Sequence, residues 1–141
     1  MDGLGAHPSG YNNPPDVRAD YTDAAEPNFK GHRSFYFQET MLSYRTVMAS
    51  YNDANKLIWP TEFGWASSSS PLPNYEYAAN VTEAEQAQYL VKAYQMMKAW
   101  GWAGPAFCWN LNYNDTSPNT EMAQFGVWNR PAYISLRDMV K

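Results

Sequence analysis

Residues 56–65, KLIWPTEFGW, place one carboxylate among aromatic side chains at the end of an apolar run. The run before Pro60 predicts a short strand, because its side chains are apolar and suit a buried sheet. Pro60 breaks the run, and Glu62 then lies between Trp59 and Trp65. A charge in such apolar surroundings is costly unless it is paired or hydrogen-bonded. The end of this strand is therefore the first candidate for a functional site.

Two further apolar stretches predict strands, at residues 3–7 and 103–111, on either side of the strand at 56–59. None of the three alternates cleanly between apolar and polar side chains. Such runs are typical of parallel strands that are buried on both faces. The sequence therefore predicts a parallel sheet.

Helical patterns separate these strands. Residues 34–51 repeat apolar side chains three or four positions apart, which predicts one buried helix face. Thr82 and Glu85 form a capping box that predicts the start of a second helix, with Gly101 at its end. A proline at the start of residues 131–140 favours a last short helix there. The side chains expected to face inward are Phe37, Met41, Tyr44, Val47, Met48 and Tyr51 in the first helix, and Ala87, Leu90, Val91, Tyr94 and Met97 in the second.

Long loops follow the strands, at residues 8–33, 64–81 and 112–124. In a parallel sheet these loops gather at the carboxyl edge, where active sites form. Three successive strand–loop–helix units predict an α/β fold with right-handed crossovers. Three parallel strands leave both sheet edges open. We therefore expect residues 1–141 to form a single unit that is incomplete as an independent domain and is completed by further strands or by self-association.

Composition narrows the classes of function. The net charge of −4 argues against a nucleic-acid partner. No apolar run approaches the roughly 18 residues of a membrane span, so no membrane partner is expected. Residues 1–4 have neither the basic nor the apolar segment of a signal peptide, and the localisation stays open.

His7 and His32 lack the ligand spacing of a metal site, and neither a metal nor a cofactor is expected. Cys108 has no partner for an internal disulfide, and its apolar neighbours favour a buried thiol.

Aromatic residues make up 16% of the chain, and many fall in segments rich in Pro, Asn and Gly rather than in periodic ones. Rings in such loops form flat platforms beside amides and carboxylates. Sugars present C–H faces and hydroxyl edges, and such platforms complement both. Carbohydrate is therefore the expected ligand, with a tyrosine-rich core as the alternative.

Three motifs together resemble the C-terminal part of the (β/α)8-barrel retaining glycoside hydrolases of clan A, which includes cellulases, mannanases and xylosidases. Residues 2–11, DGLGAHPSGY, resemble the sixth barrel strand and the loop that follows it. Residues 56–65 resemble the seventh strand, which carries the nucleophilic glutamate. Residues 104–111, GPAFCWNL, resemble the eighth, whose tryptophan lines the sugar subsite. The resemblance covers nearly the whole chain and implies a partial TIM barrel of about three βα units.

The resemblance also implies roles for single residues. Glu62 takes the place of the nucleophile, and His7 takes the place of a residue that orients it. A retaining glycosidase needs two carboxyl groups about 5–5.5 Å apart, one as nucleophile and one as acid/base. In the family the acid/base glutamate follows an asparagine, and this chain contains no Asn-Glu pair. The substrate contacts implied are Tyr11, Trp65, Trp109, Asn110 and Asn112.

Several alternatives remain open at this point. For Glu62 the less favoured alternative is an ion pair with Arg33 or Lys56, and for His7 the alternative is a core histidine. Trp109 is able to pack in the core. The family usually has tyrosine where Ser9 stands, which puts one sugar contact in question.

The favoured function is hydrolysis of O-glycosidic bonds in β-linked glycans by retaining double displacement, with the acid/base missing from this chain. The alternative is a barrel fragment that binds carbohydrate without cleaving it, or that associates with itself.

Overall fold

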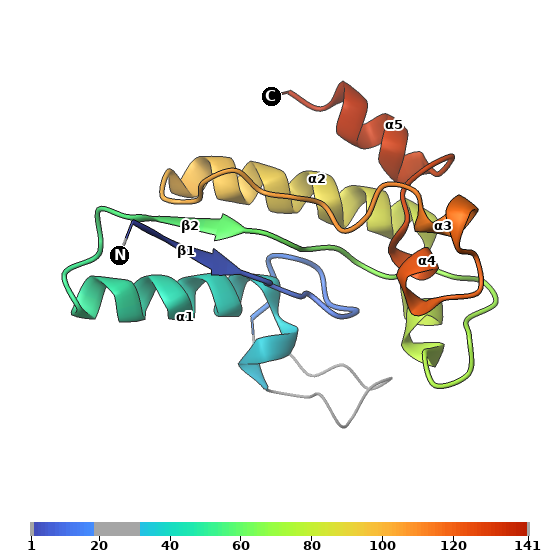
Figure 1. Ribbon diagram of the computed structural model, residues 1–141, viewed down its shortest axis with the longest axis horizontal. Coiled ribbons are helices and arrows are strands. Elements are labelled where there is room, and N and C mark those ends of the chain that lie inside the picture. The colour runs from blue at the N-terminus through green and yellow to red at the C-terminus, as the bar shows by residue number, and fades with distance from the viewer. Residues whose placement is uncertain (1, 19–31, 141) are drawn as a thin grey trace.

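The computed structural model describes residues 2–18 and 32–140, so residues 19–31 of the first predicted loop lie outside it. Two parallel strands, β1 (Gly3–Ala6) and β2 (Leu57–Pro60), pair with each other. In the view of Figure 1, α1 (Phe37–Ser50) lies beside β1 and α2 (Glu83–Trp100) lies beside β2. The register pairs Gly3 with Leu57 and Ala6 with Pro60. The predicted α/β class and the parallel direction of these two strands are confirmed.

The third predicted strand, at 103–111, is not a continuous strand in the structure. Isolated parallel bridges join Ala103 to Ile58 and Cys108 to Phe63. Between the bridges, the Phe107 backbone N–H donates to the Pro60 carbonyl at 2.8 Å. The break contains a proline, which has no N–H to donate to a ladder. This segment still lies along β2, on the side away from β1.

Helix α1 covers most of the predicted segment 34–51, but part of its predicted buried face is exposed. Residues Arg33–Phe35 form a separate 3-10 turn, η2. Phe37, Met41 and Met48 are buried, whereas Val47 and Tyr51 are 56% and 77% exposed. Tyr44 is also exposed. The prediction that Tyr44, Val47 and Tyr51 face inward is therefore wrong, because no described element covers that part of the helix.

Helix α2 confirms its predicted start and end. The Thr82 hydroxyl accepts from the Glu85 N–H at 3.2 Å, and the Glu85 carboxylate accepts from the Thr82 N–H at 2.8 Å. Gly101 adopts φ 66°, a left-handed conformation that glycine takes without steric cost. The remaining helices are η3 (Glu76–Asn80), α3 (Tyr113–Thr116), α4 (Glu121–Phe125) and α5 (Pro131–Asp138), and α5 packs on α2 (Figure 1).

The core lies on one face of the sheet. In β2, Ile58 and Pro60 are buried, whereas Leu57 and Trp59 are 38% and 41% exposed. Side chains of α1 and α2, together with Ile58 and Phe63, form one apolar cluster. The opposite face of the sheet, which carries Leu57 and Trp59, is left open.

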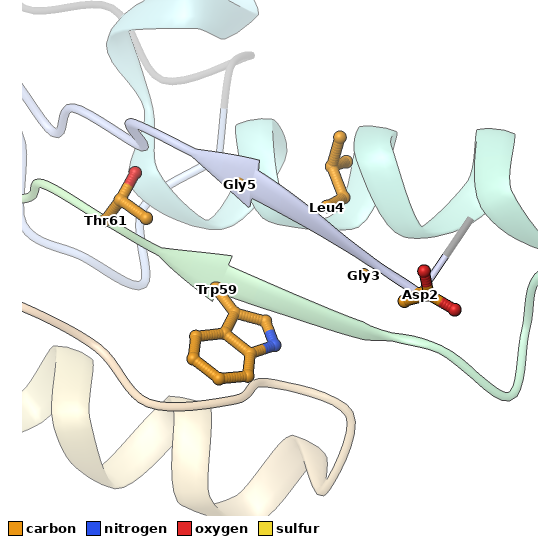
Figure 2. Close-up of a pocket in the computed structure, with 6 residues that line it drawn as sticks. All are labelled: Asp2, Gly3, Leu4, Gly5, Trp59 and Thr61. Atoms are coloured by element: carbon orange, nitrogen blue, oxygen red, sulfur yellow. The ribbon is translucent and has the colours of Figure 1, made fainter.

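Figure 2 shows this open face, where the Trp59 ring extends from β2 towards the segment that follows α2. A Cβ at Gly3 would meet the ring at 3.4 Å, and a Cβ at Gly104 would meet it at 3.0 Å. Glycines on both neighbouring segments therefore make room for the indole. A cavity of about 360 Å³ beside it is lined by Asp2, Gly3, Leu4, Gly5, Trp59 and Thr61. Among the helices of the described residues, none is long and apolar enough to cross a membrane.

The capping box gives a stability prediction. Thr82→Ala removes the side-chain acceptor of the Glu85 N–H, and we expect a loss of about 1 kcal/mol in the free energy of unfolding. Thr46→Ala is the matched control, because Thr46 is exposed inside α1 and alanine is the better helix former there. Denaturant unfolding followed by circular dichroism measures both. Equal stability of the two variants would contradict the capping role.

Burial gives a prediction for Cys108. Packing against the core raises the pKa of the Cys108 thiol to about 12. At pH 8 its thiolate fraction should then be lower than that of an ordinary thiol by roughly a hundredfold or more. Iodoacetamide should therefore label the folded chain slowly and the urea-unfolded chain rapidly, as followed by mass spectrometry. Rapid labelling of the folded chain would contradict the burial.

Candidate active site

The end of β2 departs from regular alternation, and this departure aims Glu62. Pro60 is fully buried, and so is Phe63 three residues later, although alternation would put them on opposite faces. Phe63 packs edge-to-face against Tyr94 at 5.0 Å between ring centroids. Thr61 and Glu62 therefore both lie away from the helices. One extra residue in the strand thus turns the carboxylate out of the core.

His7 and Glu62 meet at the carboxyl ends of the two strands. His7 follows β1, Glu62 follows β2, and the parallel register brings their ends together. The His7 Nδ1 atom lies 3.7 Å from Glu62 Oε2. The side chains are 63% and 45% exposed, so both are open to a ligand. The titratable neighbour of Glu62 in the structure is therefore His7, rather than Arg33 or Lys56, which were the alternatives for an ion pair.

Trp109 completes the pocket that these two residues line. The pocket has a volume of about 130 Å³, and Ser9 and Phe125 also contribute to its wall. The Trp109 N–H donates to the Phe63 carbonyl at 2.8 Å, which fixes the ring beside the end of β2. The peptide bond between Trp109 and Asn110 is cis. The structure thus brings His7, Glu62 and Trp109 to one pocket.

The two predicted asparagines play a different part in the structure. Asn110 is buried, and its Nδ2 donates to the Met122 carbonyl at 2.7 Å. Its Oδ1 accepts from the Tyr113 N–H at 3.0 Å, so both ends of the amide are occupied by the backbone. Asn112 is the residue before α3, and its Oδ1 is buried. Neither amide lines the pocket, and the contacts of Asn110 direct it into the loop that follows Trp109.

Trp65 is a core residue, which corrects the prediction that it contacts substrate. Its side chain is 1% exposed, and its Nε1 donates to the Asn13 carbonyl at 2.8 Å. Phe37 packs against it at 5.8 Å between ring centroids. The ring is inside because Phe63 and Trp65, two residues apart, point to the same side of the chain.

Tyr11 lies near the pocket but does not line it. It has φ 54°, and its ring stacks on Tyr77 at 4.8 Å and meets the edge of Phe35 at 5.5 Å. Tyr77 donates to a Glu121 carboxylate oxygen at 3.0 Å. Burial, followed by the charge of Glu121, raises the pKa of Tyr77 well above its usual value. Tyr77 is therefore a neutral donor that ties the loop after β2 to α4.

A group of polar side chains that sequence analysis missed holds the loops around the site. Arg130 Nη1 donates to the carbonyls of Ser67 and Gln124, each at 3.1 Å. Burial lowers the pKa of its guanidinium, and Glu83 opposes that shift. Gln86, fully buried, donates to the Trp65 carbonyl at 2.8 Å. The spacing of these residues gives no signal in the sequence, because their partners are backbone carbonyls from distant loops.

The described residues offer no group of three His, Cys, Asp or Glu side chains arranged to hold a metal ion. Among the pocket residues, Glu62 supplies the carboxylate and His7 the titratable nitrogen. Such a pair suits nucleophilic attack by a carboxylate held by a neighbouring donor. It does not by itself supply the second carboxyl group of a glycosidase.

The fold and the site define an α/β protein with a carboxylate-bearing pocket at the carboxyl ends of parallel strands. A family 39 glycoside hydrolase from the gut symbiont Bacteroides cellulosilyticus WH2 has a similar structure, with a TM-score of 0.61 and 19% sequence identity. The match covers 94% of this chain and 25% of that protein, so this chain spans about a quarter of that protein's length. No family model and no curated protein matches the chain. The fold is therefore similar to part of a glycoside hydrolase.

The close packing of the pocket wall gives a prediction. A Cβ at Gly64 would overlap the carbonyl oxygen of Trp109, which belongs to the backbone and cannot turn aside. We expect Gly64→Ala to cost roughly 1–3 kcal/mol of unfolding free energy and to displace Trp109. Gly5→Ala is the control, since its Cβ would meet Thr61 at an ordinary 3.7 Å. Thermal unfolding and tryptophan fluorescence measure the two effects, and equal behaviour of the variants would contradict the close approach.

Proposed function

We propose that this chain is the C-terminal part of a (β/α)8-barrel glycoside hydrolase and carries the nucleophile of a retaining mechanism, Glu62. The observation that carries the proposal is the 3.7 Å contact between His7 and Glu62 at the ends of adjacent parallel strands. Active sites of such barrels form at this end of the strands. The similarity of the fold to a family 39 glycoside hydrolase supports the class of enzyme.

In the proposed first step, a Glu62 oxygen attacks the anomeric carbon of a β-linked glycan. The bond from that carbon to the leaving oxygen breaks, and the leaving oxygen takes a proton from an acid. His7, whose Nδ1 lies 3.7 Å from Glu62 Oε2, orients the carboxylate. Trp109 stacks against the sugar ring. In the second step water displaces Glu62 from the anomeric carbon, and the sugar is released with its original configuration.

The acid/base and the remaining strands are proposed to come from outside this chain. In the described residues the open face of the sheet exposes Leu57, Trp59 and Phe107, and apolar surface of this kind marks an interface. The proposed partner is the rest of the barrel, with self-association as the alternative. Light scattering over a range of concentrations separates them, since self-association alone makes the mass of the isolated chain rise with concentration.

The test uses substrates whose leaving groups depart without protonation. The isolated chain is incubated with 2,4-dinitrophenyl β-glycosides of glucose, xylose, mannose and galactose. Attack by Glu62 should release dinitrophenolate in a burst of about one equivalent, because the glycosyl-enzyme has no base to help water hydrolyse it. Mass spectrometry of a protease digest should then place the added sugar on Glu62.

Glu62→Gln should abolish both the burst and the adduct, because an amide is a poor nucleophile. Glu39→Gln is the matched control, since Glu39 pairs with Arg18 and does not line the pocket. An adduct on another residue would contradict the assignment of Glu62.

The second candidate function is binding of carbohydrate without cleavage, which the single carboxylate among the pocket residues favours. Calorimetry with sugars then gives binding, whereas the activated glycosides give neither burst nor adduct.

A further inference from the structure

The pocket beside Glu62 is small in this chain. Its volume of about 130 Å³ is well below the roughly 300–1,000 Å³ of sites that enclose a larger ligand. A glycan has further units joined to the first. The surface next to this pocket is the place in this chain where a second unit would lie.

Tyr113 extends the aromatic wall of the pocket onto that surface. Its ring centroid lies 5.7 Å from that of Trp109, and the two planes differ by 35°. Trp109 lines the pocket and Tyr113 does not, so the Tyr113 ring lies beside the pocket, against Trp109. Tyr113 is 36% exposed, which leaves ring surface open to a ligand.

The local structure holds Tyr113 in this position. Its N–H donates to Asn110 Oδ1, and the same amide is fixed to the Met122 carbonyl by its Nδ2. The Ser117 N–H donates to the Tyr113 carbonyl at 2.9 Å and closes the turn of α3. A ring held on both sides of its backbone loses little freedom when it binds a ligand. Asn110 thus acts on the site through the placement of Tyr113.

The other tyrosine near the pocket is less suited to this role. Tyr11 already stacks on Tyr77 and contacts the edge of Phe35, so neighbouring rings occupy its surface. Tyr113 has one such ring contact, with Trp109, among the ring pairs of the described residues.

We propose that Tyr113 forms a second sugar subsite, which stacks against the unit next to the one held by Trp109 and Glu62. The ligand class is a β-linked oligosaccharide of two or more units, rather than a monosaccharide. This inference rests on the proposed carbohydrate function and adds to it a preference for an oligosaccharide over a monosaccharide.

The test compares monosaccharides with β-linked disaccharides by titration calorimetry of the full chain. The pairs are glucose with cellobiose, xylose with xylobiose, and mannose with mannobiose. For the sugar that binds, the disaccharide should bind about tenfold more tightly than its monosaccharide, as expected for one added stacking contact. Equal affinities in the unaltered chain overturn the second subsite, whatever the behaviour of any variant.

Variants assign the effect to the ring. Tyr113→Ala should remove most of the advantage of the disaccharide over the monosaccharide. Tyr113→Phe should keep the advantage, because it keeps the stacking surface. Tyr51→Ala is the control, since Tyr51 is 77% exposed at the end of α1. An unchanged disaccharide advantage in a folded Tyr113→Ala variant overturns the role of Tyr113, and so does loss of the advantage in Tyr113→Phe, which removes only the hydroxyl.

The outcomes also distinguish a failure of the second subsite from a failure of the proposed carbohydrate function. If a monosaccharide binds but its disaccharide gains nothing, the second subsite is wrong and the carbohydrate function stands. If no sugar binds and no activated glycoside labels Glu62, both are wrong.

Discussion

The site depends on one irregularity, the extra residue between Pro60 and Phe63. With regular alternation, a buried Pro60 would place Phe63 on the open face and Glu62 in the core. Phe63 instead packs among aromatic side chains of the core, and burial of such a ring contributes about 2–3 kcal/mol. Burial of Glu62 in that place would cost several kcal/mol. The apolar gain on one side and the cost of a buried charge on the other therefore hold the carboxylate at the end of the strand.

The loops around Glu62 are held by polar contacts to backbone rather than by regular structure. Arg130 joins the loop after β2 to α4 through two carbonyls, and Gln86 joins α2 to the same loop. The Gln124 carbonyl also accepts from the Ser67 N–H, whereas the carbonyls of Ser67 and Trp65 would otherwise need another partner inside the protein. Gly64 lets the Trp109 backbone approach closely. The pocket wall is thus fixed by groups that take no part in the proposed chemistry.

The open face of the sheet contrasts with this well-packed side. Trp59 lies against glycines on both neighbouring segments, as in an interior where large and small side chains alternate. Yet Trp59 and Phe107 are 41% and 53% exposed, and the outer part of α1 is exposed as well. The glycines beside Trp59 leave room for its ring, and the described residues supply no side chains that cover the rest of this face. This agrees with a fold that matches a quarter of a larger protein.

The sequence by itself determined the two strands β1 and β2, the helices α1, α2 and α5, and the position of the carboxylate. The capping box, Gly101 and the apolar run before Pro60 set the limits of α2 and the place of β2, because these signals act between residues close in the chain. Motif resemblance brought together His7, Glu62 and Trp109. Only the tertiary structure decided that Trp65 is buried and that Asn110 holds a loop. It also decided that part of α1 stays exposed, since burial depends on which distant segments come to lie against a side chain, and periodicity alone does not contain that information.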